Sequence, residues 1–200
     1  DALLRPSYSQ ILNSSRDFFL SLCDTDARLI AQADHLPVHV GALPWATIAV
    51  EERFKDVRPG DVILLNDPYH GGSHLPDVTV FVPVFAGEKR LLWTIVRAHQ
   101  SDIGGGTHGA YNPAATEIWQ EGLRIPPIKL YEAGRLRDDL LDLLALNVRN
   151  PREFRGDLQA MLGAANLGER RVSKLFSEFG TVVLRQGTIE AIADLLDTYE

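Results

Sequence analysis

The chain has 200 residues, of which 45% are hydrophobic and 24% are charged, a composition that excludes a disordered protein. A net charge of -7 argues against a dominant surface for nucleic acid. No apolar run is long enough to cross a bilayer, so no membrane span is expected.

The only cysteine, Cys23, cannot form a disulfide within the chain, which favours a reducing compartment such as the cytoplasm. It lies in an apolar segment, so we expect a buried core thiol. The chain begins with Asp1 instead of methionine and stops at Glu200 within a predicted helix. We therefore expect a portion of a longer protein.

The first third of the chain mixes strand and helix signals. Residues 17–23 and 28–33 are apolar segments separated by turn-forming residues, which predicts a β-hairpin. One amphipathic helix over residues 8–23 is the competing interpretation. Residues 41–54 have a helical pattern with glutamates on the exposed side.

The middle third has the pattern of a β-structure. Residues 62–65 form a short apolar run, and residues 78–85 and 91–98 are apolar on both faces, as buried strands are. The five residues 86–90 between the last two include a glycine, which predicts a hairpin. Pro83 indicates an edge position or a bulge in its strand.

The remainder is a loop followed by helices. Residues 103–127 are rich in Gly, Pro, Asn and Thr and predict a long functional loop with one helical turn near 116–120. Acidic residues open a helix over 138–147. A long helix is expected over 151–179, with Asn150 as its N-cap, and a last helix over 187–200.

This order of elements predicts an α+β fold, with a central antiparallel β-hairpin or sheet in the first half and a helical C-terminal third. We expect a mixed α/β region over residues 1–135 that carries a metal site. Residues 136–200 are expected to form a helical region that continues into a missing C-terminal portion.

Histidines and aspartates concentrate at one end of the predicted hairpin. With the hairpin loop centred on Glu88, Asp77 and His99 lie opposite each other, their Cβ atoms about 5 Å apart. His74 precedes Asp77 by three residues. Two imidazoles and one carboxylate form a ligand set that suits zinc, manganese or iron(II). A register slip of one residue would separate them, and histidines in loops more often serve as surface residues.

Neighbouring residues offer supporting roles. Asp102 is a candidate to orient His99 through a hydrogen bond, or else a loop-capping aspartate. Residues 104–106 are three glycines, which form a flexible loop or present N–H groups to an anion. Neither a P-loop nor a G-x-G-x-x-G segment opening a helix occurs, so no nucleotide site is expected.

Several longer motifs are distributed over nearly the whole chain. The most specific is N-D-P-Y-H-G-G-S-H-L-P-D-V at 66–78. The others are R-D-F at 16–18, P-V-H-V-G at 37–41, P-G-D-V at 59–62, A-H-Q-S-D-I-G-G at 98–105, E-I-W-Q-E-G-L-R-I-P-P at 117–127 and R-G-D-L-Q-A at 155–160. With these motifs the chain resembles the hydantoinase B/oxoprolinase family.

The resemblance implies a divalent metal bound by Asp17, His74, Asp77 and His99, of which Asp17 comes from the resemblance alone. The candidate catalytic residues are His74, His99 and Asp102. In the family an E-R-x-D pattern often ends at this first aspartate, and the glutamate position is Ser14 here, a departure that puts a role for that side chain in doubt.

The resemblance also implies a hetero-oligomer. In the family, a hydantoinase A-type subunit with an actin-like ATPase fold binds ATP and phosphorylates a small cyclic-amide substrate, and the metal subunit acts on the product. The expected function is thus a metal-binding, N-terminal portion of an ATP-dependent hydantoinase, 5-oxoprolinase or lactamase. The alternatives are a subunit of an acetone- or acetophenone-type carboxylase and a non-catalytic assembly module.

Overall fold

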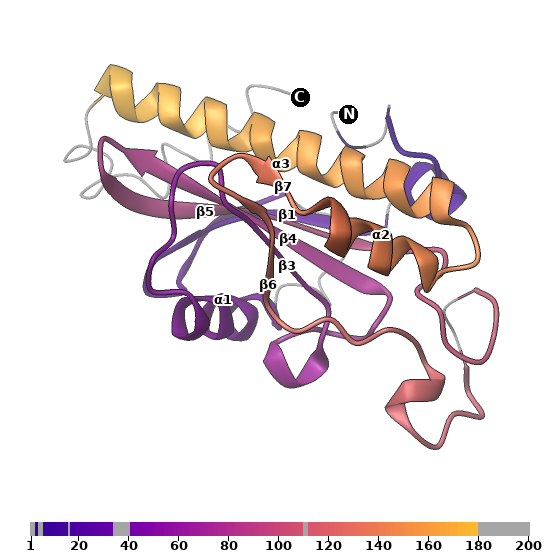
Figure 1. Ribbon diagram of the computed structural model, residues 1–200. Helices are drawn as coiled ribbons and strands as arrows, with labels where there is room; N and C mark the ends of the chain where they lie inside the picture. The colour runs from indigo at the N-terminus through magenta and orange to yellow at the C-terminus, as the bar shows by residue number, and fades with distance from the viewer. Residues whose placement is uncertain (1–2, 4–5, 16, 34–40, 110–111, 180–200) are drawn as a thin grey trace.

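The computed structural model describes residues 3, 6–15, 17–33, 41–109 and 112–179. Within them the chain has the predicted α+β fold, with a sheet from the first two thirds and long helices at the end (Figure 1). The predicted helix over 187–200 lies outside the described residues. Each described helix is too short or too polar to span a bilayer.

The described strands form one antiparallel sheet of seven strands, in the order β2-β1-β5-β4-β3-β6-β7. The longest strands, β4 and β5, lie at its centre. The bounds are β1 Phe18–Asp24, β2 Leu29–Gln32, β3 Val62–Leu65, β4 Asp77–Ala86, β5 Lys89–His99, β6 Ile128–Glu132 and β7 Arg135–Leu136.

Helices cover both faces of this sheet. The longest helix, α3, lies along one face, and α1 lies on the opposite face (Figure 1). The described helices are α1 Leu43–Arg53, α2 Asp138–Leu146 and α3 Pro151–Phe179, with a π-helical turn η1 Ile11–Ser15 and 3-10 turns η3 Pro68–His70 and η4 Ile118–Gln120.

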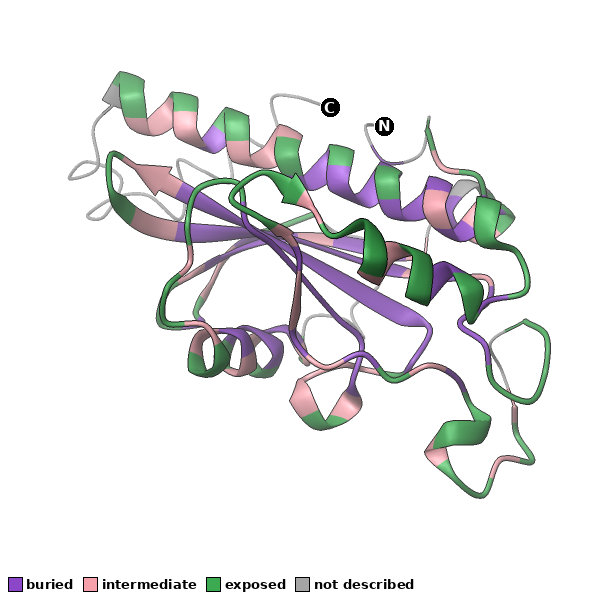
Figure 2. Ribbon diagram, viewed as in Figure 1, coloured by how far each residue is buried: buried purple, intermediate pink, exposed green. Residues whose placement is uncertain are grey.

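Successive side chains of the central strands point to opposite faces of the sheet, so the core has two layers. Val80 and Val96 pack with α3 residues such as Met161, whereas Phe81 and Ile95 pack with α1. Successive side chains of a strand point to opposite faces, so a strand covered on both sides is apolar throughout. Figure 2 shows β4 buried along most of its length.

The central hairpin keeps the predicted pairing but has a shorter loop. The expected five-residue loop is wrong, because β4 extends to Ala86 and β5 starts at Lys89, which leaves a two-residue turn. A register shift between Val84 and Phe85 reconciles the tight turn with the pairing of Asp77 and His99 at the other end. Gly87 has a φ of 62°. Tight hairpin turns need positive φ, which glycine adopts readily.

Pro83 does not mark an edge strand, since β4 lies between β5 and β3. The ladder between β3 and β4 ends at Phe81, so Pro83 lies beyond the last residue paired with β3. Its missing N–H is tolerated there. The register shift that follows at Val84 agrees with the alternative expectation of a bulge.

The other predicted elements fall close to their expected places. The hairpin of β1 and β2 is confirmed, and a single helix over 8–23 is wrong. The thiol of Cys23 is buried, and burial raises its pKa to about 11, as befits an inert core thiol. Glu153 N donates to Asn150 Oδ1 at 3.4 Å, which is the expected N-cap of α3.

Helix α1 is tied to the sheet through Glu51. Its carboxylate accepts two hydrogen bonds from the Arg90 guanidinium, at 2.7 and 2.6 Å, and one from Trp93 Nε1 at 2.6 Å. The guanidinium also lies 4.5 Å from the centroid of the Trp93 ring. Two hydrogen bonds from one planar guanidinium to one carboxylate make a strong and directional contact.

The replacement Glu51→Gln is expected to lower the free energy of unfolding by about 1–3 kcal/mol, since it removes one charge and leaves a donor of Arg90 unsatisfied. Urea unfolding followed by circular dichroism measures the loss. Glu52→Gln, on an exposed position of the same helix, is the matched control and should change stability little. Equal effects of the two replacements would contradict this role of Glu51.

Candidate metal centre

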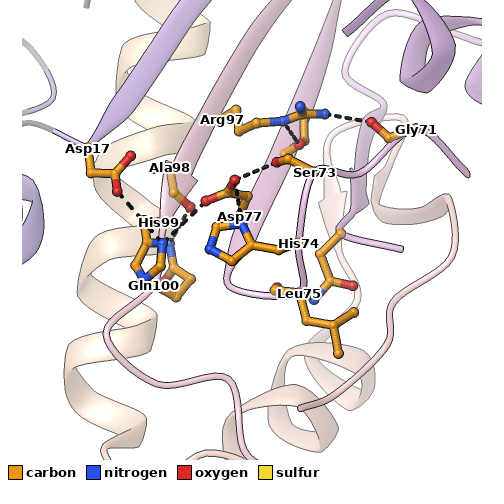
Figure 3. A network of polar contacts seen from close by, with 12 residues as sticks. Asp17, Gly71, Ser73, His74, Leu75, Asp77, Arg97, Ala98, His99 and Gln100 are labelled. Carbon is orange, nitrogen blue, oxygen red and sulfur yellow. Dashed lines mark hydrogen bonds and ion pairs between the residues drawn. The ribbon is translucent and has the colours of Figure 1, made fainter. Parts of the chain in front are cut away.

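Three potential ligands converge where β4 begins and β5 ends. Asp77 and His99 are directly paired across the two strands, as the sequence predicts. His74 reaches them from the turn before β4, where Asp77 N donates to the His74 carbonyl oxygen at 3.0 Å. The ligand atoms of the three side chains all lie within 4.8 Å of one another, and Figure 3 shows them pointing toward a common space.

The contacts within this triad centre on the Asp77 carboxylate. His74 Nδ1 lies 2.8 Å from Asp77 Oδ2, and His99 Nδ1 lies 3.4 Å from Asp77 Oδ1. The two imidazole rings are 5.0 Å apart between centroids and tilted by 42°. Ser73 Oγ also donates to Asp77 Oδ2. The three predicted ligands are therefore brought together without a direct bond between the imidazoles.

Asp17, which the family resemblance adds, lies beside the triad. It directly precedes β1, the strand paired with β5, and its carbonyl oxygen accepts from His99 N at 3.0 Å. Its carboxylate Oδ2 lies 3.7 Å from His99 Nδ1. The side chain thus approaches the triad from the third neighbouring strand.

The electrostatics keep Asp77 ionised. Burial by itself would raise the pKa of this carboxyl, which is 1% exposed. Hydrogen bonds from His74 and Ser73, together with the nearby imidazole of His99 at 3.4 Å, outweigh burial and hold the pKa well below its usual range. The hydrogen bond to Asp77 raises the pKa of His74 against the opposing effect of burial. An ionised carboxylate is the form that binds cations.

The donor set fits a divalent cation. His99 Nδ1 is buried and has no hydrogen-bond partner of good geometry among the residues described. A ring nitrogen in that state costs free energy unless something else binds it. Two imidazoles and a carboxylate suit zinc, manganese or iron(II), and a second carboxylate, that of Asp17, lies within reach of His99.

Asp102 makes its hydrogen bonds away from His99. Its carboxylate accepts from Arg149 N at 2.6 Å and from Arg149 Nη1 at 2.8 Å. The same guanidinium donates to the carbonyl oxygens of Gly104 and Gly105, at 3.4 and 2.7 Å. Gly106 N donates to the Gln120 carbonyl oxygen. A direct bond orienting His99 is thus not among the contacts of Asp102, and two of the three glycines here accept through their carbonyl groups.

Two buried residues near the triad were missed by the sequence reasoning. Asn66 Nδ2 donates to the carbonyl oxygens of Leu75 and Leu123, at 2.6 and 2.9 Å, and its Oδ1 accepts from Ile125 N at 2.7 Å. Arg97, fully buried on β5, donates to Thr79 and Gly71. The available signal for Arg97 was a charged residue near the end of a largely apolar run, residues 91–98.

The turn that carries His74 depends on Gly71. This residue has a φ of 82°, and a Cβ on it would lie 2.0 Å from Ala46 N at the start of α1. Only glycine therefore fits at this contact between the turn and the helix.

We expect Gly71→Ala to destabilise the protein by about 1–3 kcal/mol more than Gly134→Ala. Gly134 also has a φ of 82°, but nothing lies within 4 Å of the position that a Cβ would take there. The control therefore carries only the cost of the left-handed backbone, about 1–2 kcal/mol. Chemical unfolding of both variants measures the difference, and equal losses would rule out the contact with α1.

Comparison with known proteins identifies the family of this chain. The family model for hydantoinase B/oxoprolinase matches residues 1–196. The chain belongs to the hydantoinase B/oxoprolinase family.

Individual relatives are similar along almost the entire chain. The beta subunit of the caprolactamase from Pseudomonas jessenii is 38% identical over 98% of this chain and 34% of its own length. The B subunit of a putative D-/L-hydantoinase from Pseudomonas sp. (strain NS671) is 32% identical over 98% of this chain and 33% of its length. The chain therefore spans about a third of the length of these relatives.

Two solved structures share the fold. The crystal structure of the ATP-dependent caprolactamase from Pseudomonas jessenii superposes with a TM-score of 0.88 at 37% identity, over 99% of this chain and 34% of that chain. A nucleotide-free acetone carboxylase gives a TM-score of 0.86 at 20% identity, over 94% of this chain and 25% of that one. The second likeness concerns the fold alone.

Proposed function

We propose that this chain is the metal-binding portion of a B-type subunit in an ATP-dependent hydrolase of cyclic amides. The observation that carries the proposal is the convergence of His74, Asp77 and His99 within 4.8 Å. It occurs in a chain that is 38% identical to the beta subunit of a caprolactamase.

The names of the relatives support the substrate class. Caprolactam, hydantoin and 5-oxoproline are all cyclic amides, and proteins named for acting on them are similar to this chain. An amide carbonyl is a poor electrophile, and phosphorylation of its oxygen would create a good leaving group. In this proposal a partner of the hydantoinase A type binds ATP and carries out that phosphorylation.

His74, Asp77 and His99 would hold the divalent ion, with Asp17 as a fourth ligand. When bound, such an ion supplies Lewis-acid chemistry and stabilises negative charge on an oxygen atom. Asp77 contributes its ionised carboxylate, and the two imidazoles contribute ring nitrogens in the unprotonated form. Ser73 holds the Asp77 carboxylate in place through its hydroxyl group. Asp102 keeps a supporting role, through the loop that follows His99.

The same proposal predicts the metal content of variants. The complete protein should contain about one divalent ion per chain, and His74→Ala or His99→Ala should lose most of it while the fold remains, because both residues lie at a strand end or in a turn. Elemental analysis and circular dichroism measure the two properties. His108→Ala, at an exposed loop position, is the control and should retain its metal. A metal-free wild-type protein would favour a non-catalytic assembly module.

The complex with its ATPase partner is expected to open a cyclic amide only when ATP is present. Product analysis with isotope-labelled bicarbonate distinguishes this reaction from that of a ketone carboxylase. No label should enter the product, because ring opening adds water. Incorporation of labelled carbon would instead assign the chain to a carboxylase and overturn the proposed hydrolase.

A further inference from the structure

The three ligands of the triad are held in different ways. Asp77 and His99 belong to paired strands, so the sheet fixes their backbone. His74 lies in the turn between η3 and β4, and its side chain is 47% exposed. The position of this imidazole therefore depends on what immobilises the turn.

Arg97 holds the first residue of that turn. Its Nη2 donates to the Gly71 carbonyl oxygen at 2.9 Å, and its Nε donates to Thr79 Oγ1 at 2.8 Å. Because Thr79 is the cross-strand partner of Arg97, the guanidinium is fixed to the rigid centre of the sheet. Figure 3 shows it reaching from β5 to the backbone of Gly71.

Asn66 holds the other end of the turn. Its Nδ2 donates to the Leu75 carbonyl oxygen at 2.6 Å, directly after His74. Asn66 follows β3, so this anchor also comes from the sheet. The residues from Gly71 to Leu75 are thus bound at both ends by side chains that are completely buried.

Stability alone does not account for an arginine in this place. Arg97 is 0% exposed, its Nη1 has no hydrogen-bond partner among the residues described, and burial lowers the pKa of its guanidinium to about 10. Burial of an incompletely bonded charge is unfavourable, and apolar residues of similar volume often replace buried ionic groups without loss of stability. One of its two hydrogen bonds fixes Arg97 to Thr79, the other binds the backbone of the turn that carries His74, and its charge also interacts with the Asp77 carboxylate.

We propose that Arg97 is a positioning residue for the metal centre, which holds His74 in place for binding a divalent cation. The inference rests on the proposed metal site. Partners that orient metal ligands typically change metal affinity by about 10–100-fold when they are removed. Arg97 acts on the backbone of the turn and does not itself bind the ion.

The test compares two arginines of the same strand, in the full-length protein. Arg97→Met is expected to raise the Kd for Zn²⁺ by about 10–100-fold, measured by competition with a chromophoric chelator. Arg90→Met removes the contact with Glu51, so it should lower thermal stability and leave the Kd within about twofold of the wild type. Arg97→Met should therefore have the larger effect on metal affinity, and Arg90→Met should have the larger effect on thermal stability.

A spectroscopic measurement separates positioning from a general loss of structure. With Co²⁺ as the probe, the visible absorption spectrum of Arg97→Met should approach that of His74→Ala, because both lose the same imidazole from the ion. Amide hydrogen exchange of residues 72–75 should also be faster in the metal-free variant, while exchange in β4 and β5 remains slow.

A second pair of variants keeps the test decisive if Arg97→Met does not fold. Thr79→Val removes the acceptor of Arg97 Nε, whereas Thr94→Val removes a buried hydroxyl that has no hydrogen-bond partner among the residues described. The first should weaken Zn²⁺ binding and the second should not. Unchanged affinity and Co²⁺ spectra in both Arg97→Met and Thr79→Val, or in Thr79→Val alone where the arginine variant is unfolded, would overturn the inference. If the wild type binds no Zn²⁺, the proposed metal site itself fails.

Discussion

The register between β4 and β5 is the constraint on which the rest of this structure depends. Side chains alternate between the two faces of a strand, so a slip of one residue would separate Asp77 from His99. It would also exchange the side chains that pack against α3 with those that pack against α1. The tight turn at Gly87 and the pairing of Asp77 with His99 are incompatible with an uninterrupted ladder, and the register shift after Val84 resolves the conflict. The register shift thus lies next to the turn of the hairpin, at the opposite end from the triad.

The covered sheet explains where chemistry is possible. With α3 on one face and α1 on the other, the middle of each central strand is filled by apolar side chains. Polar ligands can gather only where strands end and loops begin. The turn of His74, the end of β5 and the residue before β1 meet at one such end, because β1, β5 and β4 are successive neighbours in the sheet.

Much of this arrangement was readable from the sequence. Continuous runs that are apolar on both faces predicted β4 and β5, and a hairpin loop centred on Glu88 predicted that Asp77 pairs with His99. The short strands β6 and β7 were not predicted, because five and two residues are too few to show a clear pattern of apolar and polar residues. The bond between Asp102 and Arg149 joins residues 47 apart in the sequence, and no local pattern encodes such a contact.

That contact has a mechanical consequence. Arg149 lies just before Pro151, where α3 begins, and both its backbone N–H and its guanidinium are bound by the buried carboxylate of Asp102. The loop that follows His99 is therefore linked to the start of α3, a helix of 29 residues. At a rise of about 1.5 Å per residue this helix is roughly 44 Å long. The two can move independently only by breaking bonds to a buried charge, so the end of β5 and the start of α3 behave as one rigid piece.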